Sequence, residues 1–133
     1  MSHAHTDGAH DERTAGILRR RATGLMGLDE AVAELADADG TAAIAVMIAD
    51  RVRLRPEMVS RALDADSDEA ISVLCRAAGL KINSYSALLR MRRRGRRGLD
   101  SAPSHALTFF SDLTPASAER LLQRIAALDA SER

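Results

Sequence analysis

The sequence predicts an all-α protein, built as a short HEAT-like stack of antiparallel helical hairpins, with a compact helical bundle as the alternative. Three observations lead to this prediction. Aromatic residues make up only 2% of a chain that is 46% hydrophobic, so the core has to be built from aliphatic residues, most of which favour helices. Apolar residues recur at i, i+3 and i+4, the spacing of a helix with one buried face. A helical pattern also repeats along the chain.

The N-terminal part is polar and acidic. Residues 1–12 are small, polar and dotted with histidine, and they predict a disordered tail because they cannot bury enough apolar surface to offset the entropy of ordering. A weak, glycine-containing helix over 11–25 leads into a clearer one at 28–38. Asp39-Gly40 then breaks the chain.

Six helices follow this break, and several begin at a proline. Pro56, Pro103 and Pro115 suit the first helical turn, where a missing backbone N–H costs nothing. Gly79 suits the left-handed residue that follows a helix end. The expected helices are 41–53, 56–63, 69–78, 83–94, 103–113 and 115–128. We expect residues 13–128 to form one domain, followed by a short tail at 129–133.

Three segments resemble one another. They are LRPEMVSRAL (54–63), LKINSYSALL (80–89) and LTPASAERLL (113–122), spaced by 26 and 33 residues. Each has a leading Leu, a Pro or Ile two residues later, and a Leu at the tenth position. A helical hairpin of this size cannot bury its apolar faces alone, whereas stacked copies can, which favours the repeat stack over the bundle.

The apolar stripes of these helices predict the core. The expected core residues are Ile44, Met47, Ile48, Val59, Leu63, Ile71, Leu74, Cys75, Ala78, Leu80, Tyr85, Leu88, Leu89, Phe109, Phe110, Leu113, Leu121, Leu122 and Ile125.

Charge is unevenly distributed although the formal net charge is zero. Residues 1–50 carry four Arg and nine acids, whereas residues 51–133 carry fifteen Lys or Arg and ten acids. The stretch 70–99 holds eight basic residues and no acid. Such a division lets the two halves pair with each other, or leaves a basic face for an acidic partner.

A run of arginine ends the predicted helix 83–94 and is the main candidate for partner binding: Arg90, Arg92, Arg93, Arg94, Arg96 and Arg97. Guanidinium groups bind phosphates and carboxylates well. Two simpler interpretations compete with binding. Cations are stabilised at a helix C-terminus even when they bind nothing, and the acidic N-terminal half could pair with them. Among partners, an acidic protein surface is favoured over nucleic acid or anionic lipid.

Other candidate sites are weaker. Cys75 could be a nucleophile with His105 as its base, but it lies on an apolar stripe and is better explained as a core residue. His3, His5 and His10 lie in a tail that fixes no geometry for a metal. The sequence contains no phosphate-binding glycine loop or metalloprotease motif. We therefore expect no enzyme activity, no cofactor and no metal site.

The element LCRAAGL at 74–80 is followed by the arginine-ended helix and by a closing helix that starts LTPASAER at 113–120. In these elements and their order, the chain resembles an alphaproteobacterial family, the domain of unknown function 2336. The resemblance covers roughly residues 40–125. The resemblance implies a HEAT-like helical array, and it supplies no catalytic residues and no established activity. Typical members are longer, with more helical repeats before this part.

These observations lead to a functional hypothesis. We expect a non-catalytic protein–protein interaction or regulatory module, which could also self-associate through the ends of its stack. The alternative is a nucleic-acid-binding module that uses the arginines at 90–97. No apolar run approaches the ~20 residues of a membrane-spanning helix. A single cysteine and the lack of a secretory signal favour the cytoplasm.

Overall fold

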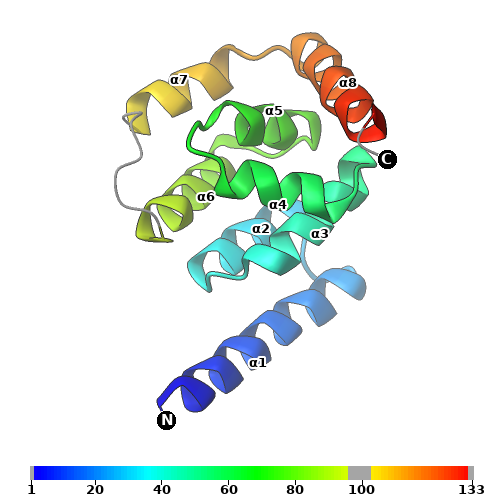
Figure 1. Ribbon diagram of the computed structural model, residues 1–133. Coiled ribbons are helices and arrows are strands. Elements are labelled where there is room, and N and C mark those ends of the chain that lie inside the picture. Colours follow the sequence, from blue (N-terminus) through cyan, green and yellow to red (C-terminus); the bar gives the residue numbers. More distant parts are fainter. Residues whose placement is uncertain (1, 96–102, 132–133) are drawn as a thin grey trace.

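The computed structural model describes residues 2–95 and 103–131, and these residues form eight helices and no strand (Figure 1). The predicted all-α class is confirmed, and a repeat stack and a helical bundle are both compatible with it. The helices are α1 (Ser2–Ala22), α2 (Leu28–Asp37), α3 (Thr41–Val52), α4 (Pro56–Asp64), α5 (Glu69–Ala77), α6 (Ile82–Gly95), α7 (Pro103–Asp112) and α8 (Pro115–Ser131).

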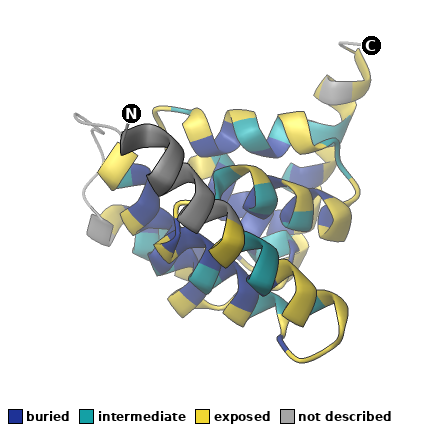
Figure 2. Ribbon diagram, turned by 90° about the horizontal axis from the view of Figure 1, so that it is seen from below, coloured by how far each residue is buried: buried dark blue, intermediate teal, exposed yellow. Residues whose placement is uncertain are grey.

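Helix packing does not follow the chain order. The most extensive contacts are between α2 and α6, between α3 and α4, and between α5 and α8. In Figure 1, α1 lies at one end of the molecule, and α7 and α8 lie over α5 at the other. Each helix whose side chains are described turns one face to the interior and another to solvent, as the colours of Figure 2 show.

The three similar segments occupy equivalent places. Each starts two residues before a helix, namely α4, α6 or α8. The tenth residues of the segments, Leu63, Leu89 and Leu122, are all buried. The pattern therefore marks the start and the inner face of every second helix.

Only part of the predicted hairpin arrangement is present. α3 and α4 pack closely, but α5 and α6 are not among the closely packed pairs of described helices. In the turn that joins them, Gly79 adopts φ +80°, a conformation that a residue without Cβ reaches at no steric cost. Helix α6 packs most extensively on α2 instead, where Asp29 of α2 binds the start of α6.

The turn between α3 and α4 has the same left-handed geometry without a glycine. Arg53 ends α3 with φ 60° in the left-handed region, where a non-glycine residue is uncommon. The next backbone N–H, of Leu54, donates to the Ala49 carbonyl at 3.0 Å. Pro56 then occupies the first turn of α4, as its fixed φ predicts.

Most of the predicted core residues are buried: Ile44, Ile48, Val59, Leu63, Ile71, Leu74, Cys75, Ala78, Leu80, Tyr85, Leu88, Leu89, Phe110, Leu113 and Leu122. Met47, Phe109, Leu121 and Ile125 are only half-buried. In α8 the buried stripe is formed by Ala118 and Leu122. Leu121 lies about 100° around the helix from Leu122, at the edge of this stripe.

The N-terminal region differs from the prediction. Backbone from Ser2 onward belongs to α1, whereas the sequence predicts a disordered tail over 1–12. The segment contains no proline, and adding residues to an existing helix costs little compared with starting one. Ile17 of α1 and Met26 of the following turn are buried, so this region contributes to the core. The division into tail, single domain and C-terminal tail stays a prediction.

Candidate interaction surface on helix α6

Helix α6 carries the predicted arginine run, and α2 holds it in place at both ends. At its start, the Asp29 carboxylate accepts hydrogen bonds from the Lys81 backbone N–H and the Ser84 hydroxyl, both at 2.7 Å. Toward its end, Arg94 donates to the Ala36 carbonyl at 2.6 Å. The start of α2 therefore lies beside the start of α6, and the two helices run parallel.

The inner face of α6 contains one of the predicted partner-binding arginines. Arg92 is 3% exposed, since it lies seven residues after Tyr85 and four after Leu88 on the same helical face. Its Nε donates to the Asp68 carboxylate at 3.0 Å. Asp68 is itself buried. The pair is therefore a buried ion pair and not a surface contact.

The remaining donors of Arg92 bind the backbone between α4 and α5. Nη1 donates to the carbonyls of Ala62 (3.1 Å) and Leu63, and Nη2 to those of Ala65 (2.9 Å) and Ser67 (3.3 Å). One guanidinium thus satisfies the end of α4 and the following turn, where helical carbonyls lack partners of their own. The hypothesis that the whole arginine run contacts a partner does not fit this residue.

Two further arginines also bind within the protein. Arg93 Nη2 lies 3.4 Å from Asp68 Oδ2, so both oxygens of this carboxylate face a guanidinium. Arg94 Nη2 lies 3.0 Å from Asp39 Oδ1, and this pair is about half exposed. Pairing of the arginine run with the acidic N-terminal half, one of the simpler interpretations, thus applies to Arg94, whereas Arg93 pairs with an acid of the second half.

The outward face of α6 has a different composition. Arg90 is exposed and forms no ion pair with another residue that the structure describes. Asn83 and Ser86 lie on the same side of the helix, seven and four residues before Arg90, and α6 contains no carboxylate. We call these three residues the α6 outer face. Arg96 and Arg97 lie outside the described residues.

A shallow groove of about 220 Å³ borders this face. It lies between α6 and α7 and is lined by Ser86, Leu89, Arg90, Arg93 and Leu107. Its floor is apolar and its rim carries guanidinium groups. Such a groove suits a side chain from a protein surface better than a whole small molecule, because ligand pockets are usually larger.

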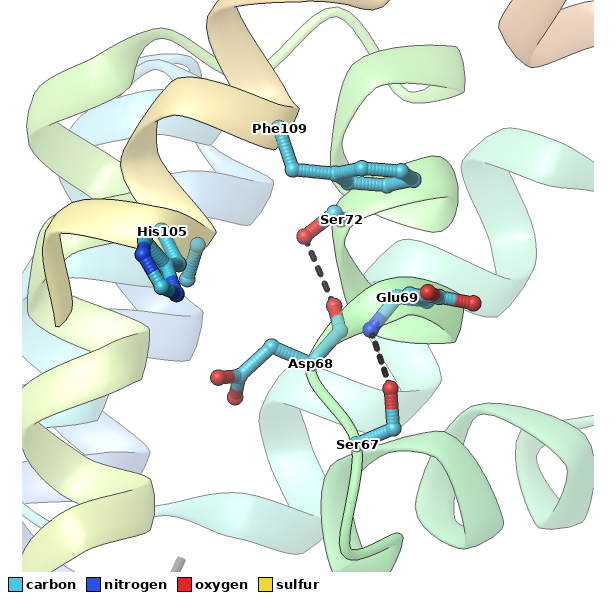
Figure 3. Close-up of a pocket in the computed structure, with 7 residues that line it drawn as sticks. Ser67, Asp68, Glu69, Ser72, His105 and Phe109 are labelled. Carbon is cyan, nitrogen blue, oxygen red and sulfur yellow. Dashed lines mark hydrogen bonds between the residues drawn. The ribbon is translucent and has the colours of Figure 1, made fainter. Parts of the chain in front are cut away.

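A second cavity, of about 190 Å³, lies between the start of α5 and α7 (Figure 3). Its lining includes Asp68, Glu69, Ser72, His105 and Phe109. Asp68 and His105 face the same space in Figure 3, but both Asp68 oxygens already contact arginines. The Ser72 hydroxyl donates to the Asp68 carbonyl at 2.7 Å. These groups support the turn before α5, and they form no nucleophile–base pair.

The aromatic layer behind this cavity is also structural. Tyr85 stacks on Phe110 with ring centroids 4.4 Å apart, and Arg76 lies 5.6 Å from the Phe110 centroid. The Tyr85 hydroxyl hydrogen-bonds to Ser72, and burial raises the pKa of Tyr85 to about 12. Burial also raises the pKa of the Cys75 thiol far above its usual range. A buried, protonated thiol is inert as a nucleophile, which fits the core interpretation of Cys75.

The described part of the chain contains neither a metal-binding cluster nor a membrane-spanning helix. Among those residues, no group of three or more His, Cys, Asp or Glu side chains is placed to hold a metal ion. No described helix is long and apolar enough to cross a bilayer. The side chains of His3, His5 and His10 lie outside the described set.

Comparison with known proteins identifies the family. The family described as "Uncharacterised protein conserved in bacteria (DUF2336)" matches residues 2–124. The chain belongs to the DUF2336 family. Neither a curated protein nor a solved structure matches it. The match reaches from α1 to α8, so the acidic N-terminal region belongs to the DUF2336 part of the chain, whereas the resemblance in the sequence covers only about 40–125.

Sequence reasoning missed the acidic residues that organise this DUF2336 chain. Asp68 and Asp29 lie 24 and 55 residues from their partners Arg92 and Ser84, so no local pattern connects them. A signal for Arg92 was present, because its spacing from Tyr85 and Leu88 puts it on the inner stripe. Pairing of the acidic and basic halves was one of the two outcomes that the charge distribution allowed, and it occurs between Asp39 and Arg94.

Proposed function

We propose that this DUF2336 chain is a non-catalytic protein-interaction module that contacts an acidic partner through the α6 outer face. The single observation that supports this proposal is Arg90. It is exposed, has no ion pair among the described residues, and sits on the rim of an apolar groove. Aromatic and arginine anchors beside apolar pockets are typical of protein interfaces.

The charge around this residue supports an acidic partner. Asn83 and Ser86 add hydrogen-bond donors on the same face, and no carboxylate of α6 opposes them. Electrostatic complementarity selects partners and steers their encounter. In this proposal the helices act as a cytoplasmic HEAT-like scaffold that fixes the position of the face.

Nucleic acid is the alternative partner. Binding through several phosphates would weaken steeply with salt, with a log–log slope of about −0.9 per phosphate contact. Within 90–94, Arg92, Arg93 and Arg94 already bind the protein itself, which leaves few guanidinium groups for a phosphate backbone. An acidic protein needs fewer contacts of this kind.

The test uses a variant that changes the face and leaves the fold intact. Arg90 is changed to Ser, and a matched control variant carries Arg124→Ser, which removes the same charge from an exposed position of α8. Proteins crosslinked to the wild-type chain in the native host are identified, and the acidic candidate is purified. Its Kd is then measured with all three chains.

We expect the face variant to bind at least about tenfold more weakly than the wild type, a change of ~1.4 kcal/mol, and the control to bind as the wild type does. Equal binding by all three chains would refute the proposal. A nuclease-sensitive complex with a steep salt slope would support the nucleic-acid alternative instead.

A further inference from the structure

The surface beside the α6 outer face is acidic. Helix α2 contains four carboxylates and no basic residue. Glu30 and Asp37 are exposed and form no ion pair with another described residue, whereas Glu34 pairs with Arg20 of α1 at 3.4 Å. Ala33 lies between them. We call Glu30, Ala33 and Asp37 the α2 outer face.

The two outer faces form one continuous surface. α2 buries Ala31, Val32 and Leu35 in the core, which turns Glu30 and Asp37 to the opposite side. α6 likewise buries Tyr85 and Leu88 and turns Arg90 outward. Since α2 and α6 pack side by side, the carboxylates of the α2 outer face lie on the helix next to the one that carries Arg90. The neighbouring side chains Ala33 and Ser86 are small and leave the surface open to close approach.

Two such surfaces complement each other in one orientation. A two-fold axis parallel to the helices places α2 of one copy over α6 of the other, and it does so twice. An axis perpendicular to the helices within the same plane would place α2 on α2 and α6 on α6, with like charges opposed, which is unfavourable. Isologous interfaces of this kind are the commonest in homo-oligomers.

The register of the helices brings the exposed charges together. Ser84 bonds to Asp29 and Arg94 to Ala36, so residue n of α2 lies level with residue n+55 to n+58 of α6. Arg90 is therefore level with residues 32–35. Asp37 of a partner copy would lie two to five residues further along, or roughly 3–8 Å at 1.5 Å per residue. This is within the reach of an arginine side chain.

We infer that the acidic partner of the α6 outer face is the α2 outer face of a second copy, in a two-fold symmetric dimer. The inference rests on the proposed function and gives its partner an identity. The surface is two helices wide, with α2 about 15 Å and α6 about 21 Å long. It is thus near the small end of specific interfaces, and its charges are exposed. The dimer is accordingly weak and sensitive to salt.

The experiment is sedimentation velocity of the full chain over a concentration series, at about 0.05 M and about 0.5 M salt. Arg90→Glu and Asp37→Arg are tested singly, together in one chain, and as an equimolar mixture of the two single variants. Arg124→Glu is the matched control, because it makes the same charge change on α8. Circular dichroism melts check that each variant is folded.

A dimer of this kind predicts a specific pattern of results. The wild type and the control dimerise at low salt and dissociate at high salt. Each single variant loses at least about tenfold in affinity. The double variant and the mixture recover it, because both restore an opposite-charge contact. A wild type that stays monomeric throughout the series, or a double variant that stays as weak as the single ones, would overturn the inference.

The same data separate this inference from the proposed function. If the chain is monomeric but Arg90→Ser still loses a host protein that the Arg124→Ser control retains, the face binds a different acidic partner and only the dimer is wrong. If the chain is monomeric and that variant also binds as the wild type does, both proposals fall.

Discussion

Arg90 and Arg92 are two residues apart on α6 and lie on opposite faces of the helix. Arg92 is 3% exposed and directs its donors to Asp68 and the backbone of the α4–α5 turn. Arg90 is exposed on the other side of the helix. Two residues on a helix are about 200° apart, so a run of identical side chains is divided by the helical period into an inner and an outer set.

Arginines that are adjacent in the sequence therefore have different roles in this protein. The inner arginine replaces missing hydrogen-bond partners at the end of α4, a structural task that requires burial. The outer arginine has no such task among the described residues, and this leaves it available to a partner. Binding arguments from composition alone would have treated the two as equivalent.

Truncation of the two arginines should affect stability very differently. Arg92→Ala removes one member of a buried ion pair and leaves Asp68 and several carbonyls without their partner. We expect a loss of ~3–5 kcal/mol in the free energy of unfolding, measured by urea denaturation. Arg90→Ala is the control and should stay within about 0.5 kcal/mol of the wild type. Similar losses in the two variants would contradict the division of α6 into two faces.

The apolar side of the inner face gives the next largest effect. Leu74 of α5 is 1% exposed, so Leu74→Ala should cost ~2–5 kcal/mol, the transfer of the lost methyl groups plus the cavity they leave. Leu128→Ala, at a position that is 64% exposed on α8, is a matched control with a small expected effect. A loss below about 1 kcal/mol for Leu74→Ala would mean that α5 does not pack as described.

The buried hydroxyl of Tyr85 should make the free energy of unfolding depend on pH in the alkaline range. Its pKa is raised to about 12 by burial, compared with about 10 in an unfolded chain. The folded state therefore binds this proton more tightly, and the corresponding stability is complete below pH ~10 and is lost as pH rises through ~12. Tyr85→Phe should cost ~0.5–1.5 kcal/mol at neutral pH, for the hydrogen bond to Ser72.

The measurement for Tyr85 is the unfolding free energy as a function of pH. We expect a shallower decline above pH ~10 in the Phe variant than in the wild type. Ser72→Ala is a control, because it removes the same hydrogen bond and keeps the titrating hydroxyl. Parallel declines in the wild type and Tyr85→Phe would show that the hydroxyl does not titrate in a buried site.

The smallest effect belongs to Arg94, which lies between the two faces. Its ion pair with Asp39 has side-chain exposures of 44% and 55%, and such pairs contribute about 0–1 kcal/mol. We expect Asp39→Asn to lower stability slightly at low salt. At about 0.5 M salt it should have no effect, because salt screens the attraction between exposed charges. A salt-independent loss comparable with that of Arg92→Ala would place Arg94 in the inner set.

Local patterns predicted the helices and most of the core, because burial of an apolar stripe is encoded within a few turns. The stripe of Ile71, Leu74 and Cys75 is one example, and the proline at the start of α4 is another. Pairing between helices was not predictable in this way. The packing of α6 on α2 depends on Asp29, whose partners are more than fifty residues away, and a hairpin pattern points to the adjacent helix instead.

The candidate site was predictable only in outline. Sequence located the basic helix, and the helical period could have separated Arg92 from Arg90. The acidic counterpart on α2 could not be assigned, since a charged stripe carries no information about which helix lies beside it. Arg96 and Arg97 remain predicted partner contacts outside the described residues.

The lone cysteine provides a built-in reporter of opening. Cys75 is fully buried next to the α5–α6 turn, and only a thiolate in contact with solvent reacts with an alkylating reagent. The rate of labelling at neutral pH thus measures how often the inner face of α5 becomes exposed, by local or by global unfolding. The protein therefore needs no added probe to report its own opening. A variant that weakens the Arg92 contacts should be labelled faster at Cys75, and mass spectrometry of the thiol adduct measures that rate.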